Sequence, residues 1–351
     1  MMTIYAVMDE RTDVHAALEP VINQFQNIHN IFTSSMMEFY EEAMSLTCAL
    51  TSKRITPNMW EMLEVMYTVF QKDEFDNFSD MMPVYYNYIT VDTQTFLSSP
   101  EYMGYMYNMC KTTLLERNPG DDCECHAAKL MEVIILQCRG MDIDTAITDF
   151  VELVLKRLTK ATTSDLRTLC LQVIIAALFY NRTLLLDILE KIPNPGMQWI
   201  LKQWIANIRR SFKGLHDKKL CVLGLVELLK MPDNAAVMEQ SRQLLPATLH
   251  LFEGLKRAYA ARDTDDSDDE GDTDEEGDSD EEGDNDEEGD NDEEGSLEAY
   301  TTTLDDEDII NEFQIFHDVM ADIQNTNLPW YTQLTSHLSE NQSNELTTLT
   351  Q

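Results

Sequence analysis

Apolar residues recur along most of the chain at the spacing of one face of an α-helix. The clearest run consists of Ala146, Ile147, Phe150, Val151, Val154, Leu155 and Leu158. Steps of one, three and four residues place these side chains on one stripe, which predicts an amphipathic helix over 142–159. The next stretch, 164–180, is apolar on more than one face, and Ser164 is a suitable N-cap for it. We therefore expect a second helix there that packs between neighbours.

The same paired pattern recurs through the first 260 residues and predicts six pairs of helices. The predicted pairs are 13–30 with 35–51, 56–71 with 77–90, 94–116 with 123–138, 142–159 with 164–180, 182–191 with 196–211, and 215–231 with 234–260. The pairs begin 33 to 48 residues apart, near the ~40–47 residues of HEAT and armadillo repeats. Tyr85–Val91 carries the best strand signal, and a helix that ends there is still favoured. We predict an all-α fold, a HEAT-repeat α-solenoid in which antiparallel helix pairs form a right-handed superhelix.

Residues 263–294 interrupt this pattern with a dense run of acids. The run holds 22 Asp or Glu residues and no Lys or Arg, and it ends in four copies of a G-D-x-D-E-E unit. Because the units contain no apolar residue and their charges repel one another, we expect a disordered, solvated loop. The predicted domains are a solenoid body over 1–262, an acidic loop over 263–295 and a C-terminal helical cap over 296–351.

Two short helices are predicted after the acidic run. The first is expected to bury Ile309, Phe313, Phe316, Met320 and Ile323, and the second is expected to begin at Pro329 and carry Trp330, Leu334, Leu338 and Leu346. Two helices of this length cannot bury their apolar faces alone. We expect them to dock on the body, as the terminal cap of a solenoid does.

The charge distribution narrows the choice of partners. The chain carries a net charge of −39, and every one of its 25 Lys and Arg residues precedes residue 263. So negative a chain repels the phosphates of nucleic acids and anionic membranes and favours basic proteins. The residues predicted to contact a basic cargo protein are Asp268, Asp269, Glu270, Asp274, Glu275, Glu276, Asp280, Glu281, Glu282, Asp286, Glu287, Glu288, Asp292, Glu293 and Glu294.

Metal sites are not indicated by the two candidate motifs. Cys123, Cys125 and His126 lie within four residues, but a zinc site needs a second ligand pair at suitable spacing, and a helix start with incidental thiols is favoured. The acidic unit that begins at Asp278 resembles the start of a calcium loop, but Gly289 stands where that loop requires a bidentate Glu. We therefore expect no metal and no cofactor.

The remaining signals indicate a non-enzymatic protein of the cytosol or nucleus. No nucleophile elbow, phosphate-binding glycine loop or zinc-protease helix occurs. Seven cysteines, an odd number inside apolar helical patterns, favour buried thiols over a disulfide framework. No apolar run reaches the ~18 residues of a transmembrane helix, and the N-terminus does not have the pattern of a signal peptide.

Longer strings resemble a known family. FYEEAMSL at 39–46, ECHAAKLMEVIILQC at 124–138 and LRTLCLQVIIAALFYN at 166–181 resemble the C-terminal portion of the importin-7 and importin-8 family, within the importin-β superfamily of nuclear import receptors. DDEDIINEFQIF at 305–316 and PWYTQL at 329–334 follow in the same order. The resemblance extends over nearly the whole chain from about residue 15.

The resemblance implies a stack of HEAT repeats with an acidic loop near the C-terminus. It also implies binding of basic cargo such as ribosomal proteins and histones, contacts with nucleoporins and importin-β, release by RanGTP, and shuttling between cytoplasm and nucleus. The family's N-terminal repeats, which carry its principal Ran-binding surface, have no counterpart in this sequence, so we expect weak or no binding of RanGTP. The alternative function is an acidic chaperone that sequesters basic proteins without transporting them.

Overall fold

The computed structural model describes residues 31–32, 39–73, 78–116, 120–192, 196–265 and 297–350. Helices are the only regular secondary structure within these ranges, and the predicted all-α fold is thereby confirmed. The chain divides into two compact units: unit 1 comprises Met1–Asn207 with Tyr300–Asn311, and unit 2 comprises Ile208–Ala299 with Glu312–Gln351. The predicted helix over 13–30 lies outside the described residues.

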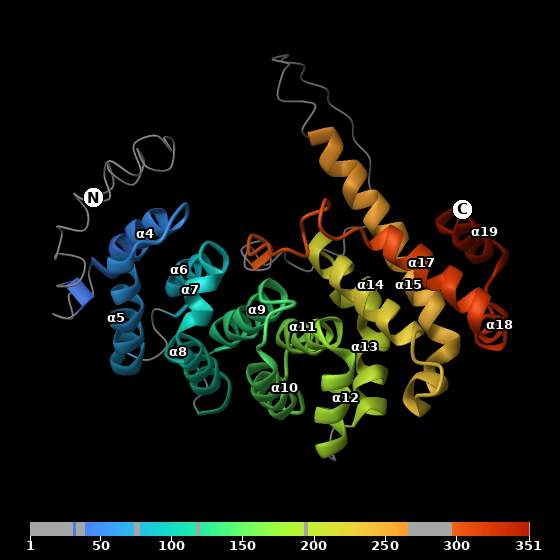
Figure 1. The fold of residues 1–351 in the computed structure, drawn as a ribbon, viewed down its shortest axis with the longest axis horizontal. Coiled ribbons are helices and arrows are strands. Elements are labelled where there is room, and N and C mark those ends of the chain that lie inside the picture. Colours follow the sequence, from blue (N-terminus) through green and yellow to red (C-terminus); the bar gives the residue numbers. More distant parts are fainter. Residues whose placement is uncertain are drawn as a thin grey trace, which may run out of the picture. The chain divides into compact units, whose positions relative to one another are not determined.

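Unit 1 arranges its helices in two rows (Figure 1). One row contains α4 (Tyr40–Thr51), α6 (Phe78–Thr90), α9 (Asp121–Gln137) and α11 (Ser164–Tyr180). The other contains α5 (Pro57–Asp73), α8 (Pro100–Lys111), α10 (Asp144–Leu158) and α12 (Arg182–Lys191). Each helix contacts its neighbours in its own row, and the rows pack on each other through pairs such as α8 with α9 and α10 with α11. Stacked helix pairs produce this two-layer order, because each pair buries its apolar face against the next.

The prediction of one continuous helix over 94–116 is wrong. The stretch forms α7 (Thr93–Ser98), α8 and a short π-helix, η2 (Thr112–Glu116). Ser99 is extended, with φ −119° and ψ 118°, and Pro100 opens the next helix. A proline disfavours helical geometry in the residue before it and lacks the N–H that an interior position needs, so a new helix starts at this point. The helix predicted to end near Tyr85–Val91 is confirmed as α6.

Helix α11 is packed on several sides, as its all-round apolar pattern predicts. It contacts α9, α10 and α12, and twelve of its residues are buried. The N-cap predicted at Ser164 is wrong. Thr163 occupies that position, and the Ser164 hydroxyl donates to Asp165 Oδ1 at 2.9 Å. Ser164 is already the first residue of α11, so its hydroxyl does not stand at the N-cap position.

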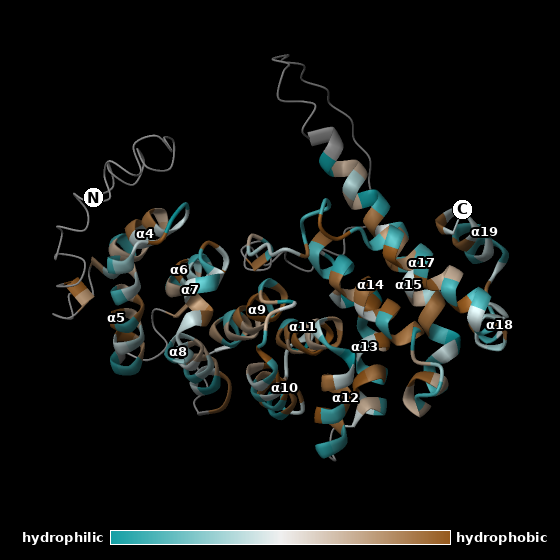
Figure 2. Ribbon diagram, in the orientation of Figure 1, coloured by the Kyte–Doolittle hydropathy of each residue, from teal (hydrophilic) through white to brown (hydrophobic). Residues whose placement is uncertain are grey.

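Unit 2 combines two helices that precede the acidic run with three that follow it. These are α14 (Leu215–Leu229) and α15 (Ala235–Asp265), then α17 (Glu312–Thr326), α18 (Leu328–Thr335) and α19 (Glu340–Leu349). α17 packs on α14, and both α18 and α19 pack on α15. The boundary between the units falls inside α13 (Met197–Ser211). Hydrophobic (brown) and hydrophilic (teal) residues alternate along the ribbon of this helix in Figure 2.

Two details of the predicted cap are wrong. α17 begins at Glu312 rather than near residue 309, so Ile309 is 62% exposed and Ile310 is buried in its place. The helix predicted from Pro329 onward is divided into α18 and α19. A reciprocal capping box starts the second, in which the side chains of Ser339 and Gln342 each accept from the other's backbone N–H.

Candidate functional site

The fifteen acids predicted to bind cargo, from Asp268 to Glu294, lie outside the described residues. The structure does describe the two segments that flank them: α15, which ends at Asp265, and the chain from Leu297 onward. We call Tyr300–Asn311, the part of the chain that belongs to unit 1 although it follows the acidic run, the return segment. The described part of the site therefore consists of the contacts that hold these two flanking segments in place.

A buried polar cluster in unit 2 fixes the helix that leads into the acidic run. Tyr259, on α15, donates its hydroxyl to Glu312 Oε1 at 2.7 Å. The other carboxylate oxygen of Glu312 lies 3.5 Å from Lys219 Nζ, and both side chains are 2% exposed. The ring of Phe252, two turns before Tyr259 on the same face of α15, lies 5.0 Å from the Phe316 ring. A hydrogen bond and aromatic packing thus hold α15 to α17, and the Lys219–Glu312 ion pair joins α17 to α14.

Glu298 attaches the first residues after the acidic run to unit 2. Its carboxylate lies over Gly214, the N-cap of α14, where a Cβ would collide with it. A carboxylate is favourable at this position, because the N-terminal end of a helix carries partial positive charge. Lys218 lies nearby, and burial lowers the pKa of its ammonium, although Asp217 and Glu298 oppose that effect.

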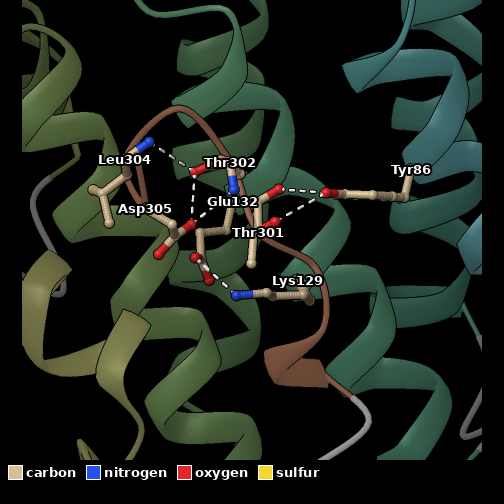
Figure 3. A network of polar contacts seen from close by, with 7 residues as sticks. All are labelled: Tyr86, Lys129, Glu132, Thr301, Thr302, Leu304 and Asp305. Atoms are coloured by element: carbon tan, nitrogen blue, oxygen red, sulfur yellow. Dashed lines mark hydrogen bonds and ion pairs between the residues drawn. The ribbon is translucent and has the colours of Figure 1, made fainter. Parts of the chain in front are cut away.

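The return segment is fastened to unit 1 by Tyr86 on α6 (Figure 3). The Tyr86 hydroxyl donates to the Thr301 carbonyl oxygen at 2.7 Å and lies 3.3 Å from the Thr301 hydroxyl. The rings of Tyr86 and Tyr300 lie 5.3 Å apart at 60°. Burial raises the pKa of the Tyr300 phenol well above its usual range, and the neighbouring Cys48, Asp122 and Tyr86 act in the same direction.

A tight turn follows in the return segment and seats it on α9. Asp305 Oδ2 accepts from the Thr302 backbone N–H at 2.7 Å, and the Thr302 hydroxyl accepts from the Leu304 N–H at 3.3 Å. Leu304 is buried. The Thr303 hydroxyl donates to the carbonyl oxygen of Leu136 at 3.3 Å, close to the C-terminal end of α9. The turn is therefore closed by its own side chains and joined to α9 by a threonine.

α9 carries buried charges on the part of unit 1 that receives the return segment. Lys129 Nζ donates to Glu132 Oε1 at 3.1 Å, and both residues are buried. In the view of Figure 3 this pair lies below Thr302 and Asp305. Closer to the start of α9, Glu124 accepts two hydrogen bonds from the Arg157 guanidinium, at 2.8 and 2.7 Å, and so ties α9 to α10. Each charge has an opposite partner, which is what makes burial of ions tolerable.

The cysteine and histidine motif lies at the first turns of α9. Cys125 is buried, and the His126 ring is directed to Asp122, with Nδ1 3.1 Å from Oδ1. Within the described ranges, no group of three metal-ligating side chains comes together. All seven cysteines lie in these ranges, none forms a disulfide, and five are buried, which agrees with the predicted thiols.

Sequence reasoning did not find the return segment. Its three consecutive threonines carry no apolar period, and the prediction assigned the whole stretch after residue 296 to a terminal cap. The available signal was Leu304, a single apolar residue placed between the threonines and four acids. A single residue cannot specify which distant helix it will pack against.

Comparison of the sequence with a family profile and with known proteins shows which family this chain resembles. A family profile described as "Importin-11-like, TPR repeats" matches residues 4–328. The chain belongs to the importin family. Importin-8 of Danio rerio is 42% identical over 98% of this chain, and importin-8 of Homo sapiens is 39% identical over the same share. A probable importin-7 homologue of Dictyostelium discoideum is 26% identical over 65% of it.

The chain spans 38% and 36% of the length of the two importin-8 proteins, and none of the solved structures matches it significantly. Importins are transport receptors and not enzymes, which agrees with the interpretation of the sequence. Among the helices that the structure describes, none combines the length and apolar character needed to cross a membrane.

Proposed function

We propose that this chain is the part of a nuclear import receptor that holds basic cargo proteins through its acidic run. The observation that carries the proposal is the local charge of residues 263–294, with 22 acids and no base, in a chain of the importin family. Ribosomal proteins and histones are cargo of the right chemistry, because they are rich in Lys and Arg. In this proposal the receptor shuttles between cytoplasm and nucleus.

The attachments of the acidic run support the proposal. On one side a hydrogen bond from Tyr259 to Glu312 holds α15, and on the other the carboxylate of Glu298 lies over Gly214, the N-cap of α14, with both contacts inside unit 2. A charged loop fixed at both ends has fewer conformations to lose on binding than a free tail of equal length. Each exposed ion pair contributes at most ~1 kcal/mol, so affinity has to come from many simultaneous contacts.

Neutralising the acidic run tests the proposal. The variant replaces the Asp and Glu residues of the four G-D-x-D-E-E units by Asn and Gln, which removes 16 charges at constant length. We expect it to lose most of its affinity for linker histone at physiological salt and to keep its helical circular dichroism. The parent's affinity should fall steeply with salt, because exposed charges are screened over about 8 Å at 0.15 M.

A control variant removes four charges outside the acidic run by the same change of Glu to Gln. Glu41, Glu61, Glu101 and Glu190 are exposed on helices of unit 1, and their replacement by Gln should leave histone affinity within about twofold of the parent. If the neutralised loop binds histone as tightly as the parent, the acidic run is not the cargo element.

Transport itself is distinguished from sequestration by two further partners. A transport receptor binds nucleoporin repeats and releases cargo to RanGTP, whereas an acidic chaperone does neither. We expect this chain to bind nucleoporin Phe-Gly peptides and to bind RanGTP weakly. Histone binding without nucleoporin binding would support the alternative function, an acidic chaperone that sequesters basic proteins.

A further inference from the structure

Thr303 stands in front of a run of carboxylates. Asp305, Asp306, Glu307 and Asp308 occupy the second to fifth positions after it, and the last three are exposed. Charge patterns around the acceptor hydroxyl decide which kinase recognises a substrate. Acids on the C-terminal side of a threonine fit a kinase whose substrate groove carries Arg and Lys, since guanidinium and ammonium groups pair with carboxylates.

The Thr303 hydroxyl also has a structural role that a phosphate would abolish. It donates to the Leu136 carbonyl oxygen, one residue before the end of α9. A phosphorylated threonine carries a charge of about −1.5 to −2 and has no hydroxyl hydrogen left to donate. The carbonyls at the C-terminal end of a helix carry partial negative charge, so the phosphate would be repelled from the place where the hydroxyl docks.

The charged groups around this helix end add to that repulsion or are engaged elsewhere. Asp305 lies in the same turn, and Glu132 precedes Leu136 by four residues on the same face of α9. Lys129 pairs with Glu132. Arg139, the nearest basic residue in sequence, donates from Nε to the Phe179 carbonyl, and its guanidinium lies 4.1 Å from the centre of the Phe179 ring.

We propose that Thr303 is a phosphorylation site for an acid-directed serine/threonine kinase, and that phosphorylation releases the return segment from unit 1. The γ-phosphorus of a nucleoside triphosphate forms a bond to Thr303 Oγ1 while its bond to the β,γ-bridging oxygen breaks. The nucleoside diphosphate leaves with that electron pair, and the hydroxyl proton passes to the kinase or to water. This inference goes beyond the proposed function and does not depend on cargo binding.

Docking and modification oppose each other in this arrangement. Thr303 is half-buried and its hydroxyl is engaged, so the kinase acts on the undocked segment, and the fraction of undocked molecules sets the rate. Once modified, the segment stays undocked, because the phosphate binds only weakly where the hydroxyl bound. Tyr86 strengthens the docked form through Thr301, two residues before Thr303.

The first experiment measures phosphate incorporation site by site. The purified chain is incubated with an acid-directed serine/threonine kinase and Mg-ATP, and the modified residues are quantified by mass spectrometry. Tyr86→Phe removes one hydrogen bond and keeps the ring, so it should raise the initial rate at Thr303 about two- to tenfold. Ser279, followed by Asp280, Glu281 and Glu282, serves as an internal reference whose rate should not change.

Two results of this experiment would overturn the proposal. One is modification of Ser279 with no phosphate on Thr303 in either the parent or Tyr86→Phe. The other is an equal rate at Thr303 in both proteins, which would mean that docking does not control access to the hydroxyl.

The second experiment measures release of the segment by hydrogen exchange. Phosphorylation of Thr303 should accelerate exchange of the Thr302 and Leu304 amides at least tenfold, since both now donate within the docked turn. The control is Thr303→Val, which removes the same hydrogen bond without adding charge and should have a much smaller effect. Equal acceleration by Thr303→Val, or none on phosphorylation, would show that the added charge does not release the segment.

Discussion

The indole N–H of Trp330 donates a hydrogen bond to the carbonyl oxygen of Leu229 at 2.8 Å, across 101 residues of sequence. Leu229 is the last residue of α14, so its carbonyl has no partner within its own helix. Trp330 is 3% exposed. The Trp330 side chain therefore gives the last carbonyl of α14 a hydrogen-bond partner and buries its own aromatic ring. It joins α18, which follows the acidic run, to a helix that precedes the run.

Trp330→Phe should destabilise unit 2 by about 2–3 kcal/mol, because it removes this hydrogen bond and part of a buried side chain. The free energy of unfolding from urea titration, followed by far-ultraviolet circular dichroism, measures the change. Tyr331→Phe, on the same helix, removes only a hydroxyl and should shift the value by less than about 0.5 kcal/mol. If the two variants are equally stable, Trp330 does not hold α18 in place.

Glu124→Ala should destabilise unit 1 by about 3–5 kcal/mol. The substitution leaves the Arg157 guanidinium, whose side chain is 10% exposed, without the carboxylate that accepts two of its hydrogen bonds. The exposed pair of Lys156 and Glu152 on α10 is the control, and Glu152→Ala should cost less than about 0.5 kcal/mol. Urea titration measures the free energy of unfolding of both variants. Similar losses of stability would show that the buried Glu124–Arg157 pair contributes no more than the exposed pair.

Glu312→Gln should loosen α17 from unit 2. Glutamine still accepts from the Tyr259 hydroxyl, but the Lys219 ammonium, which is 2% exposed, loses its opposite charge. An unpaired buried charge costs about 3–5 kcal/mol, so amides of residues 316–326 should exchange faster by at least a hundredfold. Replacing Lys219 by Met in the same chain removes the stranded charge and should restore most of the protection. No recovery in that double variant would mean that the charge of Lys219 is not the cause.

The stability of unit 1 should fall as the pH rises above about 9. Burial raises the pKa of the Cys138 and Cys170 thiols from an ordinary value of 9.0 to about 12, and it raises the pKa values of Cys110 and Cys125 further. The native thiols keep protons that the unfolded thiols release. Their contribution is therefore fully present below pH 9.0 and is lost as the pH approaches 12.

The slope of unfolding free energy against pH measures this effect between pH 8 and 10.5. Each thiol contributes up to about 1.4 kcal/mol per pH unit above the unfolded pKa, so Cys138→Ala should make the slope shallower by about that amount. Val133→Ala creates a cavity in α9, the helix whose C-cap is Cys138, without removing a thiol. It should lower stability at every pH and leave the slope unchanged, and an unchanged slope in Cys138→Ala as well would contradict the prediction.

The sequence by itself determined the helices. The apolar period that places Ile147, Val151 and Val154 on one face is a local property, because residues three and four apart meet in a helix whatever else the chain does. α10, α11, α12, α13 and α14 accordingly begin and end within about two residues of their predicted bounds. The charge asymmetry and the match to the importin family also needed no coordinates.

Only the tertiary structure decided where the chain goes after the acidic run. Local spacing favoured Ile309 as a buried helical residue, whereas the return segment exposes it and buries Leu304 and Ile310. Tyr86 and Thr301 meet across 215 residues, and Thr303 meets Leu136 across 167. Contacts of this kind depend on which surfaces two distant segments leave unsatisfied when they fold. Periodicity along one segment carries no information about the other, and this is why the sequence predicted a simple cap.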